Sequence, residues 1–178
     1  MNLPNRGRMV IMMISLAVAL PLAKPIWAKS RTAKLAITTS ELSKPIEITD
    51  ESVIEGIKIW SGPGNFKVEN GARIPMTRDG SILWSKGIAS APPEGGEFVQ
   101  LSFYGELPEK PIIYVLKFRY DPVAKKGYIY LPGEGEKWYD VNTGSILRGV
   151  EGNWFRASDA FTDLVESLIA KAKSAEIR

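Results

Sequence analysis

The sequence predicts an α+β fold in which an antiparallel β-sheet meander carries a short N-terminal helix and a C-terminal amphipathic helix packed on the sheet. Alternate positions of 97–104 and of 111–120 are apolar, which is typical of half-buried strands. The connections at 105–110 and 121–127 are too short for helical crossovers, so neighbouring strands are expected to be antiparallel. A small β-barrel with the helix outside is the alternative architecture.

The first 28 residues have the three parts of a secretory signal peptide. Arg6 and Arg8 precede an apolar run over 9–20, and Ala28 offers the small side chain that a signal peptidase accepts. The run is shorter than the roughly 20 apolar residues that span a bilayer, so no stable membrane span is expected after cleavage. We therefore expect an exported protein, periplasmic or extracellular, that is cleaved after Ala28.

The composition excludes several kinds of chemistry. The chain has no Cys and no His, so it cannot use disulfides, thiol nucleophiles, imidazole bases or metal sites built on those ligands. Arg6, Arg8 and Lys24 are the charged residues of 1–28, so the 23 Lys and Arg of the whole chain fall to 20 in 29–178, against 20 Asp and Glu. This balance argues against a nucleic-acid partner. We predict no catalytic residue, no metal and no cofactor.

The mature chain is expected to begin with a mobile tail at 29–34 and to continue as a single domain over 35–174. Short strands are expected first, at 35–38 and 46–48. The segment Thr49-Asp50-Glu51 supplies a capping side chain and acids for a first helical turn. Gly56 then limits the short N-terminal helix to about two turns. A strand at 57–60 is an alternative for the end of this segment.

Gly and Pro divide the remainder into short elements. Turns are expected at 61–64, at Asp79-Gly80 and at 132–137, and a surface loop at 91–96. Further strands are expected at 65–68, 128–131, 138–141, 145–148 and 153–156. Ser158 is expected to cap the C-terminal helix, whose apolar stripe consists of Phe161, Leu164, Val165, Leu168, Ile169 and Ala172.

One polar and aromatic cluster suggests a binding site. Its candidate ligand-binding residues are Trp138, Tyr139, Asp140, Arg148 and Trp154. Flat rings beside carboxylates and amides can hold sugars, because the ring face stacks on the sugar while polar groups bind its hydroxyls. The alternative is that these rings simply belong to the core or to cross-strand pairs.

Two functions follow from these observations. The leading hypothesis is a non-enzymatic module that binds a ligand or protein partner at the cell envelope. The alternative is a carboxylate-dependent hydrolase acting on extracellular polysaccharide or another polymer, in which one acid has a raised pKa and the other is a base or nucleophile. A cleft with two such acids would distinguish the hydrolase from the binding module.

Two segments resemble a known group of proteins. They are Leu42-Ser43-Lys44-Pro45-Ile46-Glu47-Ile48-Thr49-Asp50 and Gly127-Tyr128-Ile129-Tyr130-Leu131-Pro132-Gly133, the second followed by Trp138-Tyr139. Together they resemble a family of short exported or hypothetical bacterial proteins with no assigned activity. The resemblance rests on packing and turn residues. It implies a shared fold and implies no reaction and no functional residue.

Overall fold

A computed structural model describes residues 31–75, 77–90, 97–109 and 111–176. The expected signal peptide at 1–28 and the expected loop at 91–96 lie outside these ranges. Six antiparallel strands form the main sheet in the order β2-β1-β5-β6-β7-β8. Their bounds are β1 Thr32–Thr38, β2 Ile46–Ile48, β5 Val99–Gly105, β6 Ile112–Asp121, β7 Lys126–Tyr130 and β8 Trp154–Arg156.

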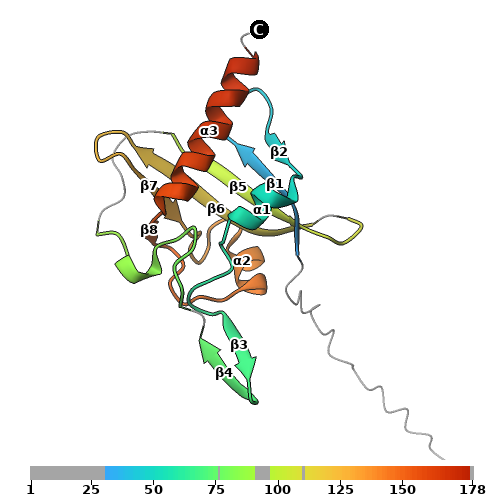
Figure 1. The fold of residues 1–178 in the computed structure, drawn as a ribbon, viewed down its shortest axis with the longest axis vertical. Helices are drawn as coiled ribbons and strands as arrows, with labels where there is room; N and C mark the ends of the chain where they lie inside the picture. Colours follow the sequence, from blue (N-terminus) through green and yellow to red (C-terminus); the bar gives the residue numbers. More distant parts are fainter. Residues whose placement is uncertain (1–30, 76, 91–96, 110, 177–178) are drawn as a thin grey trace, which may run out of the picture.

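The helices confirm the predicted α+β class. The C-terminal helix α3 (Asp159–Glu176) crosses one face of the sheet, from β7 toward β2, and the short α1 (Glu51–Gly56) lies beside β1 (Figure 1). Among the described strands, β2 and β8 are the two ends of the sheet and do not pair with each other, so the sheet is open and the barrel alternative is wrong. No helix in the described ranges is long and apolar enough to cross a membrane.

The strand register places the alternating apolar residues on one face. Leu101 of β5 lies between Ile37 of β1 and Leu116 of β6, and all three are fully buried. The same face carries Leu35, Phe103, Tyr114, Phe118, Ile129 and Phe155. This face and the helices that cover it form the hydrophobic core.

α3 seals the core as its apolar stripe predicts. Ser158 caps the helix, since its Oγ accepts from the backbone N–H of Phe161 at 3.3 Å. The Phe161 ring meets Phe118 of the sheet edge-on, with centroids 5.8 Å apart. Val165 and Ile169 continue the buried line along the helix. The predicted amphipathic helix therefore packs on the sheet.

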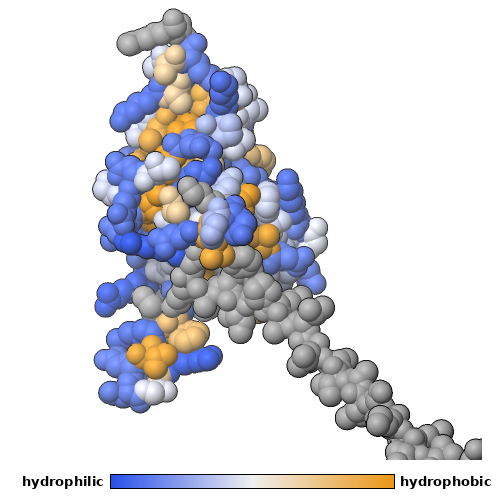
Figure 2. Space-filling view, turned by 90° about the vertical axis from the view of Figure 1, so that its right-hand side faces the viewer, coloured by the Kyte–Doolittle hydropathy of each residue, from blue (hydrophilic) through white to orange (hydrophobic). Residues whose placement is uncertain are grey.

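A two-stranded arm stands away from this body. Strands β3 (Phe66–Glu69) and β4 (Ala72–Pro75) pair with each other in a separate sheet, joined by a turn in which Asn70 and Gly71 both have positive φ. Val68 is 67% exposed, and Figure 2 shows an apolar patch on the arm surrounded by hydrophilic surface. The strand expected at 65–68 is confirmed, but the hairpin turn falls at Asn70-Gly71 and not at Asp79-Gly80.

Several other sequence expectations are wrong in detail. β1 begins at Thr32, so residues 32–34 belong to the sheet and not to a mobile tail, because Thr32 pairs with Gly105 across β5. The segment 57–60 forms no strand. Most of the predicted strand at 138–141 lies in helix α2 (Tyr139–Ser145), and 145–148 is not a strand either. The reason is that the backbone of β6 at Ile113 and Val115 bonds to side chains of α2, and not to a neighbouring strand.

Candidate functional site

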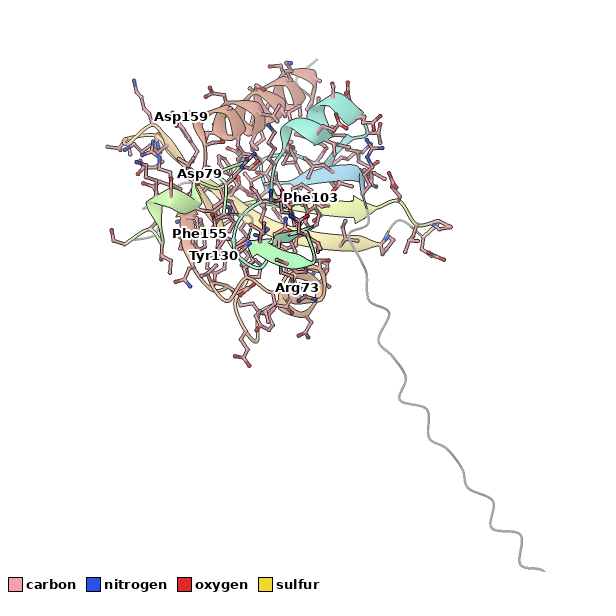
Figure 3. All side chains as sticks on the ribbon, turned by 60° about the horizontal axis from the view of Figure 1, so that its bottom comes forward. Arg73, Asp79, Phe103, Tyr130, Phe155 and Asp159 are labelled. Atoms are coloured by element: carbon pink, nitrogen blue, oxygen red, sulfur yellow. The ribbon has the colours of Figure 1, made fainter. Side chains whose placement is uncertain are left out.

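The face of the sheet opposite the core carries a row of polar and aromatic side chains. Gln100, Lys117, Tyr130 and Trp154 are cross-strand neighbours on β5, β6, β7 and β8. Tyr130 and Trp154 are half-buried, with ring centroids 5.1 Å apart. Figure 3, turned so that the bottom of Figure 1 comes forward, labels Tyr130 of β7 and Phe155 of the neighbouring β8, the residue that follows Trp154. The structure thus places the predicted site residue Trp154 on the open face of the sheet.

The ring faces of this row already have partners. Phe98 stacks on Trp154 with centroids 5.9 Å apart, and the Arg119 guanidinium lies 3.8 Å from the Phe98 centroid. The Lys117 ammonium lies 5.3 Å from the Tyr130 centroid. Cations on aromatic faces are stabilising. A sugar ring that stacked on these same ring faces would have to displace Phe98 or Lys117.

The cluster at 138–140 lies only partly on this face. Trp138 does, because its Nε1–H donates to Gln100 Oε1 at 3.3 Å, and the Lys137 ammonium sits 4.7 Å from its ring centroid. Tyr139 is half-buried and Asp140 is exposed in the first turn of α2. The structure thus brings Trp138 and Trp154 to one face.

Glu136 and Tyr130 form a hydrogen-bonded pair on the open face. The Tyr130 hydroxyl donates to Glu136 Oε2 at 2.8 Å. Burial, together with the Glu136 hydrogen bond and charge, raises the pKa of Tyr130 to about 12. Burial alone would raise the pKa of Glu136, but the Gly133 N–H, the Tyr130 hydroxyl and the Lys117 charge outweigh it and hold that pKa below its usual range. Glu136 is therefore an anion that ties the turn to the sheet.

Arg148, the fifth predicted site residue, is inside the protein and only 5% exposed. Its guanidinium donates to the carbonyls of Ile59, Ser61 and Pro63 at 2.6 to 3.1 Å, and to the Tyr114 hydroxyl at 3.0 Å. Burial raises the pKa of Tyr114, although the Arg148 charge acts against it. These contacts fix the segment 59–63 on the core side of the sheet, so Arg148 is not brought together with Trp154.

That segment forms one wall of a cavity of about 670 Å³. The volume falls within the roughly 300–1,000 Å³ of small-molecule sites. Its apolar lining comes from four parts of the chain: Ile54 and Ile57 at α1, Trp60, Ile113 at β6, and Ile146 after α2. The Trp60 ring packs edge-on against Tyr114, with centroids 5.4 Å apart, so the core holds it in place.

The uncharged polar side chains that line the cavity are bonded within the protein. Thr32 Oγ1 accepts from Trp60 Nε1, and Ser61 Oγ donates to the Lys58 carbonyl, both at 3.3 Å. Asn65 Nδ2 donates to the Trp60 carbonyl, and Ser145 Oγ donates to that of Ile113. Because these groups are already paired, the cavity offers a ligand mainly apolar contact.

Six charged residues surround the cavity: Arg31, Glu51, Glu55, Lys58, Arg78 and Asp79. Arg31 pairs with both Glu51, at 2.6 Å, and Glu55, at 3.1 Å. The hydroxyl and backbone N–H of Ser85 bond the Asp79 carboxylate and hold its pKa below its usual range. The three carboxylates of the rim are therefore engaged by protein groups.

The described residues show no arrangement typical of acid–base catalysis in this cavity. Burial raises the pKa of Glu166, against the charge of Lys173, but Glu166 lies on α3 and does not line the cavity. Within the described ranges, no three acids come together as a metal-binding group. The arrangement supports holding a ligand by burial of apolar surface.

Sequence reasoning missed this cavity. Ile54 and Ile57, three positions apart at the first helix, are the one local signal of a buried face there. Ile113 and Ile146 are distant in sequence, and nothing near them indicates an unfilled space between them.

Fold and cavity together define a small α+β protein with a ligand-sized apolar cavity at one edge of the core. Comparison of the chain with protein-family models, with curated proteins and with solved structures gives no significant match. The resemblance to short exported bacterial proteins therefore stays a prediction.

Proposed function

We propose that this protein is a non-enzymatic, exported binding module that holds a small apolar ligand in the cavity beside α1. The observation that carries the proposal is the cavity of about 670 Å³ walled by Ile54, Ile57, Trp60, Ile113 and Ile146. Burying a ligand's apolar surface against these side chains contributes about 25 cal/mol per Å². The uncharged polar side chains of the lining need no ligand, since they bond to one another and to the backbone.

The acids of the cavity rim are already paired with protein groups, and this favours ligand binding over polymer hydrolysis as the function. Glu51 and Glu55 share the Arg31 guanidinium, and Asp79 is bonded by Ser85. A general acid needs a raised pKa and a free proton to donate. The lowered pKa of Asp79 is opposite to that requirement.

Calorimetric titration of the purified protein with decanol tests the proposal. We expect saturable one-to-one binding with a negative heat-capacity change, the mark of apolar burial. Ile146→Trp should place an indole ring in the cavity, take up part of the space for the ligand and weaken binding by about tenfold or more. Leu147→Trp is the matched control, because Leu147 is the next residue and is exposed outside the cavity.

A second measurement covers the case in which Ile146→Trp fails to fold. Decanol should change the fluorescence of the wild-type protein, and Trp60→Phe should abolish most of that change because Trp60 lines the cavity. Absence of decanol binding to the wild type, or equal binding by a folded Ile146→Trp variant, would refute the proposal.

Export has its own test. The proposal that the protein leaves the cytoplasm is supported by the basic start, apolar run and small Ala28 of residues 1–28. The N-terminal sequence of the mature protein should begin at Lys29. A chain that begins at Met1, or that stays in the membrane fraction, would contradict export and cleavage.

A further inference from the structure

We propose that the ligand is an anionic amphiphile, with its tail in the apolar cavity and its anionic head between Lys58 and Arg78. This inference rests on the proposed function and adds the chemical class of the ligand. It depends on an asymmetry in the rim of the cavity: among the described residues, the acids of the rim have partners, whereas the Lys58 ammonium and the Arg78 guanidinium do not.

On the side of α1, the charged side chains of the rim pair with one another. Arg31 holds Glu51 and Glu55 in one ion-paired group. Elsewhere on the rim, Asp79 turns its carboxylate to Ser85, with both oxygens bonded at 2.5 and 2.8 Å. The acid nearest Arg78 in sequence is therefore occupied by another partner.

Lys58 and Arg78 line the same cavity and have exposed side chains. Within the part of the chain that the structure describes, the Lys58 ammonium and the Arg78 guanidinium make no hydrogen bond or ion pair. An anion at the mouth would gain two cationic donors without breaking an existing pair. A guanidinium also matches a carboxylate in a bidentate arrangement, which an alcohol cannot reproduce.

The two parts of the site predict that the affinity depends separately on tail length and on salt concentration. Affinity should rise with the apolar surface that the tail buries, so each added methylene should tighten binding about fourfold until the cavity is full. The contribution of the anionic head is electrostatic, so it should fall as salt screens the exposed cations. A purely apolar ligand would show the first dependence alone.

The experiment compares three ligands with the same ten-carbon tail: undecanoate, decanol and decyltrimethylammonium. We expect undecanoate to bind about threefold to tenfold more tightly than decanol, since exposed ion pairs contribute modestly, and the cationic ligand to bind most weakly. The double variant Lys58→Gln/Arg78→Gln should lose the preference for undecanoate and keep the affinity for decanol. Lys44→Gln/Lys171→Gln is the control, because it removes the same net charge from exposed residues outside the cavity.

The outcomes separate the inference from the function on which it rests. If decanol binds but undecanoate binds no better, or if the double variant keeps the preference for undecanoate, the anionic-head inference is wrong and the binding function stands. If neither decanol nor undecanoate binds, the proposed function itself fails.

Discussion

The side-chain amide of Asn142 bonds both backbone groups of Val115. Its Nδ2 donates to the Val115 carbonyl at 2.6 Å, and its Oδ1 accepts from the Val115 N–H at 2.7 Å. Strand β7 ends at Tyr130, which pairs with Lys117, so β6 continues beyond its neighbour. The Asn142 amide therefore completes the hydrogen bonding of β6 where a strand is missing.

Asn142→Ala should destabilise the protein by about 2–4 kcal/mol, because it leaves two backbone groups of the buried Val115 without partners. Urea denaturation would measure the loss of unfolding free energy. Thr143→Ala is the control, since this hydroxyl bonds only within α2 and its removal should cost less than about 1 kcal/mol. Equal losses in the two variants would contradict the role given to Asn142.

The contrast between β6 and α2 shows what the sequence could predict. Alternation specified β5, β6 and β7 because one face of each is buried, and residue type follows burial directly. Trp138-Tyr139 also has residues typical of strands, yet Tyr139 begins a helix. Tertiary contacts decide this segment, since Asn142 bonds a strand 27 positions earlier in the chain. No local pattern contains that partner.

In the candidate site, too, the sequence predicted what depends on neighbouring residues and missed what depends on residues far away in the chain. Trp138 and Trp154 do share a face, and both were singled out from their sequence neighbourhood. Arg148 was singled out as well, but its partners are carbonyls of 59–63, and nothing near Arg148 indicates them. The cavity escaped prediction because an unfilled space is a property of packing between distant segments.

Arg148→Met should destabilise the protein by about 3–5 kcal/mol. The substitution keeps the apolar part of the side chain but leaves the carbonyls of Ile59, Ser61 and Pro63 without their donor. Because Trp60 and Ser61 of the same segment line the cavity, decanol binding should also weaken in calorimetry. Arg156→Met is the control, since Arg156 pairs with the exposed Asp159 at 3.6 Å and the loss should stay within about 1 kcal/mol.

Phe161→Ala should cost about 3–5 kcal/mol of unfolding free energy, because the ring is buried between α3 and Phe118 of the sheet. Leu168→Ala on the same helix should cost less, since Leu168 is only half-buried. Thermal or urea unfolding measures both. If the two losses were equal and small, α3 would not be packed on the sheet as described.

The pair formed by Tyr130 and Glu136 should appear in the alkaline pH dependence of stability. The pKa of Tyr130 rises from 10.0 to about 12, so the folded state favours the protonated phenol. Its contribution should be complete below about pH 10 and be lost as the pH rises through about 12. Tyr130→Phe should remove this part of the pH dependence, and Glu136→Gln should lower the pH at which Tyr130 ionises. Ultraviolet difference spectroscopy follows the ionisation, and an unchanged titration in Glu136→Gln would contradict the coupling.

Gly127 controls how closely α3 approaches the sheet. A Cβ at this position would lie 2.3 Å from Thr162 Oγ1 and 2.6 Å from the Phe118 ring. Neither group is free to move away, because Thr162 Oγ1 donates to the Ser158 carbonyl and Phe118 is fully buried. Gly127→Ala should therefore force the helix outward and cost about 1–3 kcal/mol in urea unfolding. Gly144→Ala in α2 is the matched control, since a Cβ there meets nothing within 4 Å and Ala favours helix over Gly. A Gly127→Ala variant as stable as Gly144→Ala would mean that α3 does not depend on this close approach.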